Sequence, residues 1–212
     1  ASLLWAPSSD FSVRLSALVQ NVRRKASDEI DLGLGRERFA QNDLPFTGTY
    51  LQRARVYSAV IKGRIGGVDL ASITAYNYSY MYDRLDATPV ADGLYAGLAE
   101  QFFETTSAYL PSFTRTRAIT QEFRASIPFG KRITWLIGGL IDREDILLGN
   151  QIDAFNTGNG RSIGSIVNST IDQKYRNYAL FSSVDWSLSD RFSLQVGGRW
   201  STNRQKSVTR RS

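Results

Sequence analysis

The sequence predicts an all-β fold: an antiparallel transmembrane β-barrel fragment of about seven complete strands, with short periplasmic turns and long extracellular loops. Three observations support this fold class. Apolar and polar residues alternate with period two over many segments, as they do when successive side chains point to opposite faces of a sheet. Aromatic residues stand at both ends of the apolar stripes, and tight turns alternate with long loops. Short turns at one end and long loops at the other are typical of outer-membrane barrels.

The clearest unit is Arg176–Asn203, which reads as two alternating runs joined by a tight polar turn. Trp186 and Phe192 flank that turn. Tyr178 and Trp200 stand eight residues further out on the same apolar faces. Eight residues span about 26 Å along a strand, or about 20 Å along a membrane normal at a tilt of about 40°. This length fits inside the apolar band of about 25 Å of an outer-membrane barrel, so we interpret the hairpin as two lipid-facing strands.

The remaining elements repeat this unit along the chain. The first residues predict the end of a strand. Further strands, turns and loops follow from the same alternation and from turn-forming residues. We predict strands at 11–23, 52–65, 68–82, 117–127 and 132–143, tight turns at 7–10, 66–67, 128–131 and 188–191, and long loops at 24–50, 83–114 and 145–174.

Two features inside these segments leave alternatives open. In the second loop, Leu94, Leu98 and Phe102 recur at helical spacing and predict a short helix between residues 92 and 103. That helix either contacts a ligand or occludes the pore, or, as we favour, packs its apolar edge on the barrel wall. The facing of strand 68–82 is undecided, because alternate tyrosines lie on one parity while Ala71, Ile73 and Ala75 lie on the other.

The placement of aromatic and charged residues favours a membrane barrel over a soluble one. Alternation alone does not decide, since a soluble barrel buries its apolar face and a membrane barrel exposes it. The large aromatics cluster beside the tight turns, however, whereas a soluble core would hold them in mid-strand. The polar parity carries mid-strand charge suited to a lumen, at Arg14, Glu122, Arg124, Asp185 and Arg199. For Glu122, Arg124 and Arg199 a conduction-path or plug-contacting cluster is one interpretation, and a cross-strand charge ladder is the one we favour.

The composition excludes several classes of site. The chain has no cysteine and no histidine, which removes disulfides, zinc sites with Cys or His ligands and histidine-based catalysis. Mean hydropathy is −0.27, and the longest apolar runs are too short for a membrane-crossing helix. The net charge is +6, but its basic residues are scattered among acids along the chain, so nucleic acid is not a predicted partner.

No catalytic, cofactor or metal site is predicted, and the protein is not expected to be an enzyme. Asp142, Glu144 and Asp145 lie at the predicted junction of a strand and a loop. They could bind Ca²⁺, although a solvated acidic loop base is the interpretation we favour. The pair Gly33 and Gly35 lacks the strand–helix context of a nucleotide-binding motif. Ligand-binding residues are not predicted individually.

Four segments together resemble the barrel of TonB-dependent outer-membrane receptors. Residues 178–206 are similar to that family's hairpin of an aromatic-rich strand, a turn and a strand with a Gly-Arg pair. Residues 10–20, 68–78 and 119–126 resemble three further strands, in the family's order. The sequence shows no plug domain, no TonB box and no terminal strand that ends in an aromatic residue. We therefore expect residues 1–212 to be a mid-barrel fragment of such a receptor, with plug and C-terminal strands absent.

The resemblance implies a function. It is TonB-energised uptake of a scarce ligand, of the siderophore, cobalamin or glycan class, across the outer membrane of a Gram-negative bacterium. Implied partners are outer-membrane lipid, the receptor's own plug domain and TonB in the full-length protein, and a small extracellular ligand met by the three long loops. Two alternatives stay open: a passive porin or secretion-type barrel, and a soluble β-sheet binding module.

Overall fold

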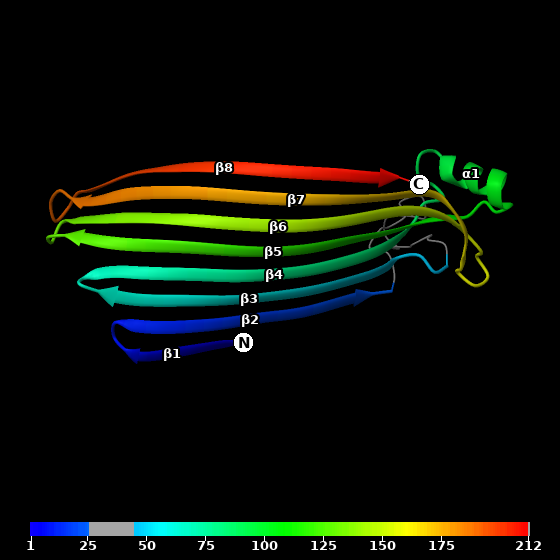
Figure 1. Cartoon of the computed structure of the whole chain (residues 1–212). Coiled ribbons are helices and arrows are strands. Elements are labelled where there is room, and N and C mark those ends of the chain that lie inside the picture. Colours follow the sequence, from blue (N-terminus) through cyan, green and yellow to red (C-terminus); the bar gives the residue numbers. More distant parts are fainter. Residues whose placement is uncertain (26–44, 212) are drawn as a thin grey trace.

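The computed structural model describes residues 1–25 and 45–211. In this part of the chain, eight antiparallel strands form one sheet in the order β1 to β8, so each strand pairs with the next one in sequence (Figure 1). The strands are β1 (Ser2–Ser8), β2 (Phe11–Arg24), β3 (Thr49–Ile65), β4 (Val68–Asp86), β5 (Ala108–Phe129), β6 (Ile133–Phe155), β7 (Ser162–Ser187) and β8 (Ser193–Arg211). The order leaves β1 and β8 as the two edges of an open sheet. The predicted fold class is confirmed, with seven long strands after a short first one.

The tight turns all lie at one end of the sheet, on the left in Figure 1. Between β3 and β4, Ile65 pairs with Val68, and the loop consists of Gly66 and Gly67 with φ of 59° and 82°. A two-residue hairpin loop of this kind needs positive φ at both positions, which glycine adopts without steric cost. Gly130, with φ of 66°, serves the β5–β6 turn in the same way. The predicted turns are therefore confirmed.

At the loop end, the strands are longer than the alternation of apolar and polar residues predicted. The loop predicted at 145–174 is mostly strand, because β6 continues to Phe155 and β7 begins at Ser162. The loop predicted at 83–114 is reduced by β4 and β5 to residues 87–107. Outside a bilayer both faces of a sheet meet water, so backbone pairing continues while the apolar alternation disappears. Most of the loop predicted at 24–50, including Gly33 and Gly35, lies outside the described residues.

The helix predicted between residues 92 and 103 is confirmed as α1 (Leu94–Phe103). Its buried side is not the predicted one. Leu94 and Phe102 are 54% and 64% exposed, whereas Ala99 is fully buried and Tyr95 packs against the small core at the loop end. The two ends of the stripe that predicted the helix, Leu94 and Phe102, therefore point away from the wall, while Leu98 between them is half-buried. The stripe one residue later packs on the wall. No helix in the described ranges has the length and apolar character needed to cross a membrane.

The sheet is a single layer, and the buried hydrophobic residues that the structure describes lie at the loop end, apart from Ala179 in the middle of β7. Fully buried side chains at the loop end include Ala87, Ala108 and Phe155. Along the rest of the strands, most side chains are only partly buried or exposed. A single sheet that buries so little apolar surface within itself needs lipid or further protein packed against its faces.

Candidate functional site

The strand register sorts the side chains onto two faces. We call the outward face the one that carries the row Ile61, Ser72, Phe123, Gly139, Leu180 and Trp200, which lie opposite one another across β3 to β8. Leu180 and Trp200 are each 62% exposed. A broad exposed apolar surface of this kind is unfavourable in water and suits lipid. The opposite face, which carries Arg14, Glu122, Arg124 and Arg199, is the lumen face.

Aromatic pairs mark the turn end of the outward face. The rings of Trp5 and Phe11 meet edge to face at 5.9 Å across the β1–β2 turn. Phe129 and Trp135 meet at 6.4 Å across the β5–β6 turn. Trp and Tyr are enriched at membrane interfaces because their rings are apolar and their N–H or O–H groups are polar, and outer-membrane barrels carry girdles of aromatic residues at both interfaces. The predicted aromatic edge is therefore assembled in space from separate hairpins.

The register decides the facing of β4, which the sequence left open. Tyr76 lies opposite Tyr57, and the two rings stack at 6.5 Å. Tyr57 belongs to the same parity as Ile61, so the alternate tyrosines of β4 face outward. Ala71 and Ile73 consequently lie on the lumen face.

Polar side chains within the outward face bond to one another. Thr74 Oγ1 donates a hydrogen bond of 2.5 Å to Gln121 Oε1, and Gln121 Nε2 donates one of 3.0 Å to Ser72 Oγ. Trp135 Nε1 likewise donates a hydrogen bond of 2.7 Å to Ser182 Oγ. In a hydrocarbon environment an unpaired polar group costs several kcal/mol. This pairing is what a lipid-facing wall requires of the few polar residues that it carries.

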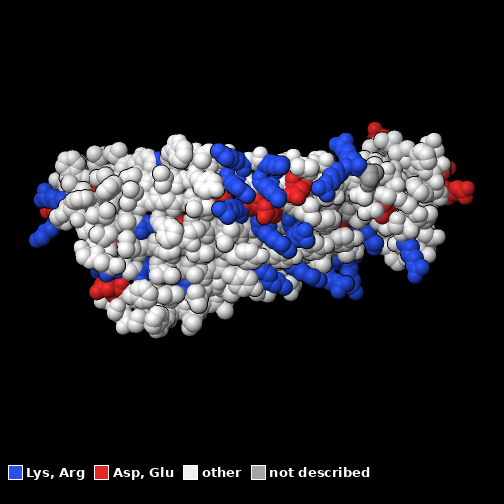
Figure 2. All heavy atoms as spheres, in the orientation of Figure 1, with Lys and Arg blue, Asp and Glu red and all other residues white. Residues whose placement is uncertain are grey.

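Beyond the apolar residues, toward the loop end, the outward face becomes strongly basic. We call this zone the cationic belt, and Figure 2 shows its side chains gathered midway along the strands. Its members, assigned from the register, are Arg53, Arg55, Arg115, Arg117, Arg143, Lys174, Arg176, Arg204 and Lys206, with Asp145 and Asp172 among them. On β7, ten residues separate Trp186 from Arg176. That is about 33 Å along the strand and about 25 Å along the normal at a tilt of about 40°, which equals the height of the apolar band of an outer-membrane barrel.

Glu122, Arg124 and Arg199 share the lumen face, but they do not form the cross-strand charge ladder that we favoured, because the cross-strand partners of Glu122 and Arg124 are uncharged. Glu122 and Arg124 form an ion pair. The Arg124 guanidinium lies 6.0 Å from the centre of the Phe181 ring, and Arg199 is the partner of Phe181 on β8. Gly138 makes room for that ring, since a Cβ there would lie 2.3 Å from Phe181 Cζ. The three predicted residues therefore face one compartment, joined through a phenylalanine that sequence reasoning did not single out.

The predicted carboxylate cluster is not formed. Asp142, Glu144 and Asp145 lie within β6, not at its junction with a loop, because β6 extends to Phe155. Strand alternation puts Asp142 and Glu144 on the lumen face and Asp145 on the outward face. Asp142 accepts a hydrogen bond of 2.7 Å from Thr120 Oγ1. The three carboxylates therefore do not converge on a common Ca²⁺ position.

The loop end carries a second, aromatic group of residues. Tyr109 and Phe155 pack with ring centres 4.7 Å apart, and the Arg84 guanidinium lies 5.1 Å from the centre of the Tyr109 ring. Burial, reinforced by the negative charge of Asp153, raises the pKa of the Tyr109 phenol. Gln151 Nε2 donates a hydrogen bond of 2.8 Å to Asp153 Oδ1. This group orders the β5–β6 extension beyond the apolar band. Sequence reasoning missed it because it placed most of these residues in loops.

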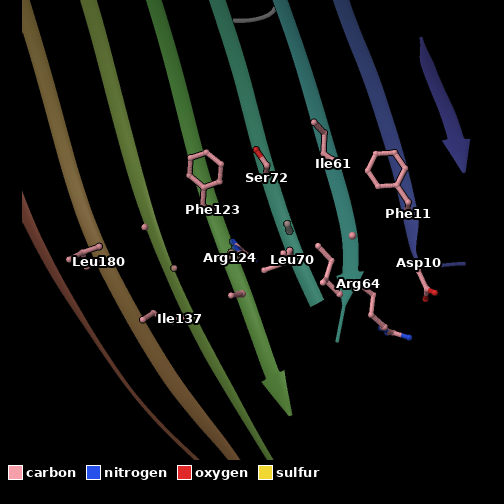
Figure 3. Close-up of a pocket in the computed structure, with 16 residues that line it drawn as sticks. Asp10, Phe11, Ile61, Arg64, Leu70, Ser72, Phe123, Arg124, Ile137 and Leu180 are labelled. Carbon is pink, nitrogen blue, oxygen red and sulfur yellow. The ribbon is translucent and has the colours of Figure 1, made fainter. Parts of the chain in front are cut away.

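The outward face is also hollowed. One hollow has a volume of 690 Å³. Its lining side chains, which include Phe11, Leu70, Phe123, Ile137 and Leu180, are drawn in Figure 3. A smaller hollow of 310 Å³ lies toward the cationic belt and shares Phe123, Gly139 and Leu180 with the first. Both are lined almost entirely by apolar atoms.

Comparison with known proteins identifies the family of this strand arrangement. Residues 8–212 match the family described as "TonB dependent receptor-like, beta-barrel". The chain belongs to the TonB-dependent receptor family. Its resemblance on residues 10–20, 68–78, 119–126 and 178–206 is thereby confirmed. A search of curated proteins found no match.

The fold agrees with this family. The chain superposes on the crystal structure of FyuA, the ferric yersiniabactin uptake receptor from Yersinia pestis, with a TM-score of 0.69 and 15% sequence identity. The match covers 100% of this chain and 30% of FyuA. The TonB-dependent receptors are transport receptors of the Gram-negative outer membrane, and this chain spans about a third of the length of FyuA with the strand arrangement of a receptor barrel. The porin and soluble-module alternatives are set aside at the level of the family.

Proposed function

We propose that the chain forms part of the wall and mouth of a larger barrel that takes up a scarce small ligand, of the siderophore, cobalamin or glycan class, with energy supplied through TonB. The barrel would lie in the outer membrane of a Gram-negative bacterium. The observation that carries the proposal is the division between an apolar outward band about 25 Å high and a lumen face with paired charges, in a chain of this family.

The lumen face and the loop end of the strands take different parts in this function. The lumen-face group of Glu122, Arg124, Phe181 and Arg199 offers a polar contact surface for a plug domain. At the loop end, the strands continue past the belt, and α1 exposes Leu94 and Phe102. Exposed apolar side chains at the mouth of a receptor suit contact with a ligand. FyuA takes up a ferric siderophore, so this class is the first to test.

The test is a transport assay on the complete protein in cells with and without TonB. Cells that express the protein are supplied in turn with a panel of ferric siderophores, with cobalamin and with oligosaccharides, and accumulation is measured. We expect one class to accumulate, and only when TonB is present. Equal, TonB-independent passage of all these solutes would instead indicate a passive pore.

A pair of variants locates the mouth. Replacing Leu94 and Phe102 by Asp should lower the affinity for the accumulated ligand, because the apolar contact of α1 is lost. The matched control replaces Phe129, which is also exposed but lies at the turn end, and should leave ligand affinity unchanged. If both variants bound the ligand as tightly as the parent protein, α1 would not be part of the ligand site.

A further inference from the structure

We propose that the tip of the β6–β7 hairpin is a latch that couples α1 to the segment that enters β3, so that these two parts of the mouth are held and released together. We call residues 155–164 the hairpin tip; they comprise the end of β6, the turn and the start of β7. Figure 1 shows α1 and this turn at the same end of the sheet. The coupling depends on the proposed function only in that this end is the mouth, and it holds for every ligand class.

The hairpin tip is ordered by its own contacts. Asn156 N–H donates a hydrogen bond of 3.0 Å to Arg161 O, and Asn156 O accepts one of 2.8 Å from Gly160 N–H. Asn156 Oδ1 accepts a third hydrogen bond, of 2.8 Å, from Gly158 N–H. Gly160 has a φ of 67°, which glycine adopts without steric cost. The tip is therefore a formed surface against which other segments can pack.

A phenylalanine ring from each of two other segments lies against a glycine of the tip. A Cβ on Gly164 would lie 2.0 Å from Phe103 Cε1, and a Cβ on Gly160 would lie 2.5 Å from Phe46 Cγ. Phe103 is the last residue of α1, and Phe46 stands three residues before β3. Glycine is needed at both positions, because any side chain there would displace the ring. The tip thus holds two segments that lie far apart in the sequence.

Hydrogen bonds fasten the tip on the side of α1. Phe155 N–H donates a hydrogen bond of 3.1 Å to Ser107 O, and Thr105 Oγ1 donates one of 3.3 Å to Phe155 O. Ser107 and Thr105 lie between the end of α1 and the start of β5. The Phe155 side chain is fully buried. Movement of the tip therefore moves the chain that follows α1.

Backbone strain is concentrated in the same two segments. Among the described residues, four that are not glycine have a positive φ: Phe46 at 72°, Ala91 and Asp92 at 54° each, and Glu104 at 56°. Phe46 lies in the segment before β3, and the other three flank α1. Such a conformation costs free energy, persists where the surroundings hold it, and recurs at switch regions. Loss of the ring contacts would therefore let both segments relax to ordinary backbone conformations.

The two ring contacts share one formed turn, so each supports the other. When the Phe103 ring is displaced, the tip is held on one side only and loses the position on which Phe46 packs. The reverse follows by linkage, since a coupling free energy acts equally in both directions. We therefore expect release of α1 to loosen the segment before β3, and release of Phe46 to loosen α1.

The test measures hydrogen exchange by mass spectrometry on the complete protein in a neutral detergent, without ligand. Gly164→Ala displaces the Phe103 ring, and Phe46→Ala removes the other ring. Each variant should raise the exchange rate at least about tenfold, both in α1 and in the peptide that contains Gly48, because both segments open more often. Gly48 N–H donates a hydrogen bond of 2.7 Å to Arg84 O, so its exchange reports on the segment before β3. If Gly164→Ala does not fold, Phe103→Ala removes the same ring without adding an atom to β7.

Two matched controls change similar contacts away from the tip. Gly149→Ala displaces the Phe113 ring, since a Cβ there would lie 2.1 Å from Phe113 Cε1, but these two residues lie within β6 and β5. Phe129→Ala removes a ring that is exposed as Phe46 is, but at the turn end. Both controls should keep exchange in α1 and at Gly48 within about twofold of the parent protein.

Three outcomes would overturn the inference. If Gly164→Ala raised exchange in α1 alone and Phe46→Ala raised it near Gly48 alone, the two segments would be independent. An equal rise in the Gly149→Ala variant would show general destabilisation instead of coupling. No rise in either tip variant would show that the rings hold neither segment. The measurement uses no ligand, so it does not depend on the outcome of the transport assay.

Discussion

An arginine placed at Leu180 should destabilise the protein strongly in a bilayer. Leu180 lies on the outward face of β7, six residues from Trp186 at the turn end and four from Arg176 in the cationic belt. At a tilt of about 40°, these separations are about 15 Å and about 10 Å along the normal, so position 180 is close to the bilayer midplane. Arginine on the lipid face at this depth costs about 2–4 kcal/mol, whereas arginine in a lumen costs far less.

The assay compares Leu180→Arg with Ser201→Arg in the complete protein folded into lipid vesicles. Ser201 lies at the same height, since it pairs with Ala179 while Trp200 pairs with Leu180, but it faces the lumen. The free energy of unfolding is measured by urea titration with tryptophan fluorescence. We expect Leu180→Arg to lose about 2–4 kcal/mol and Ser201→Arg to lose less than about 1 kcal/mol. Equal losses would refute the assignment of outward and lumen faces.

Three further changes test individual contacts. Thr74→Val leaves Gln121 Oε1 without its donor and should cost about 1–3 kcal/mol, while a triple change that also replaces Gln121 by Leu and Ser72 by Ala should be nearly neutral in the same urea titration. Gly138→Val drives a side chain into the Phe181 ring and should cost about 1–3 kcal/mol, whereas an equally stable variant would show that this ring does not occupy the lumen face. The pKa of Tyr109 is raised above its ordinary 10.0 by burial, so its contribution is present below pH 10.0 and is lost as pH rises toward the folded-state value. Tyr109→Phe keeps the ring contact and should reduce the loss of stability above pH 10.0, and an unchanged alkaline profile would contradict this role.

Local patterns predicted the hairpins well. The turn between Trp186 and Phe192, the Gly66–Gly67 loop and the short helix α1 all follow from residues that are neighbours in sequence. Turn chemistry and two-residue alternation are local properties of the backbone, so one sequence was sufficient for them. The helix's buried side was predicted wrongly, because Leu94 and Phe102 have the right spacing but the wall contacts Tyr95 and Ala99.

The ends of the strands were harder to predict, because backbone pairing continues where the alternation of side chains stops. Residues 145–155 and 162–174 are paired strand, yet they lack a steady alternation of apolar and polar residues and so resemble a loop. The same error placed Asp142 and its neighbouring carboxylates at a loop junction and suggested a common cation site. Backbone pairing, which is not written in the hydropathy of either strand, holds these residues in the sheet.

The sequence by itself determined the fold class, the turn end and the division of each strand into an apolar and a polar stripe, because these depend on the alternation of adjacent side chains. Only the tertiary structure decided which stripes share a face, which way the tyrosines of β4 point, and that Arg143, Arg176 and Arg204 stand in one row. Basic residues that look scattered along the chain become a belt when six strands are aligned. Register joins positions far apart in sequence, and a shift of one residue would send every one of these side chains to the other face.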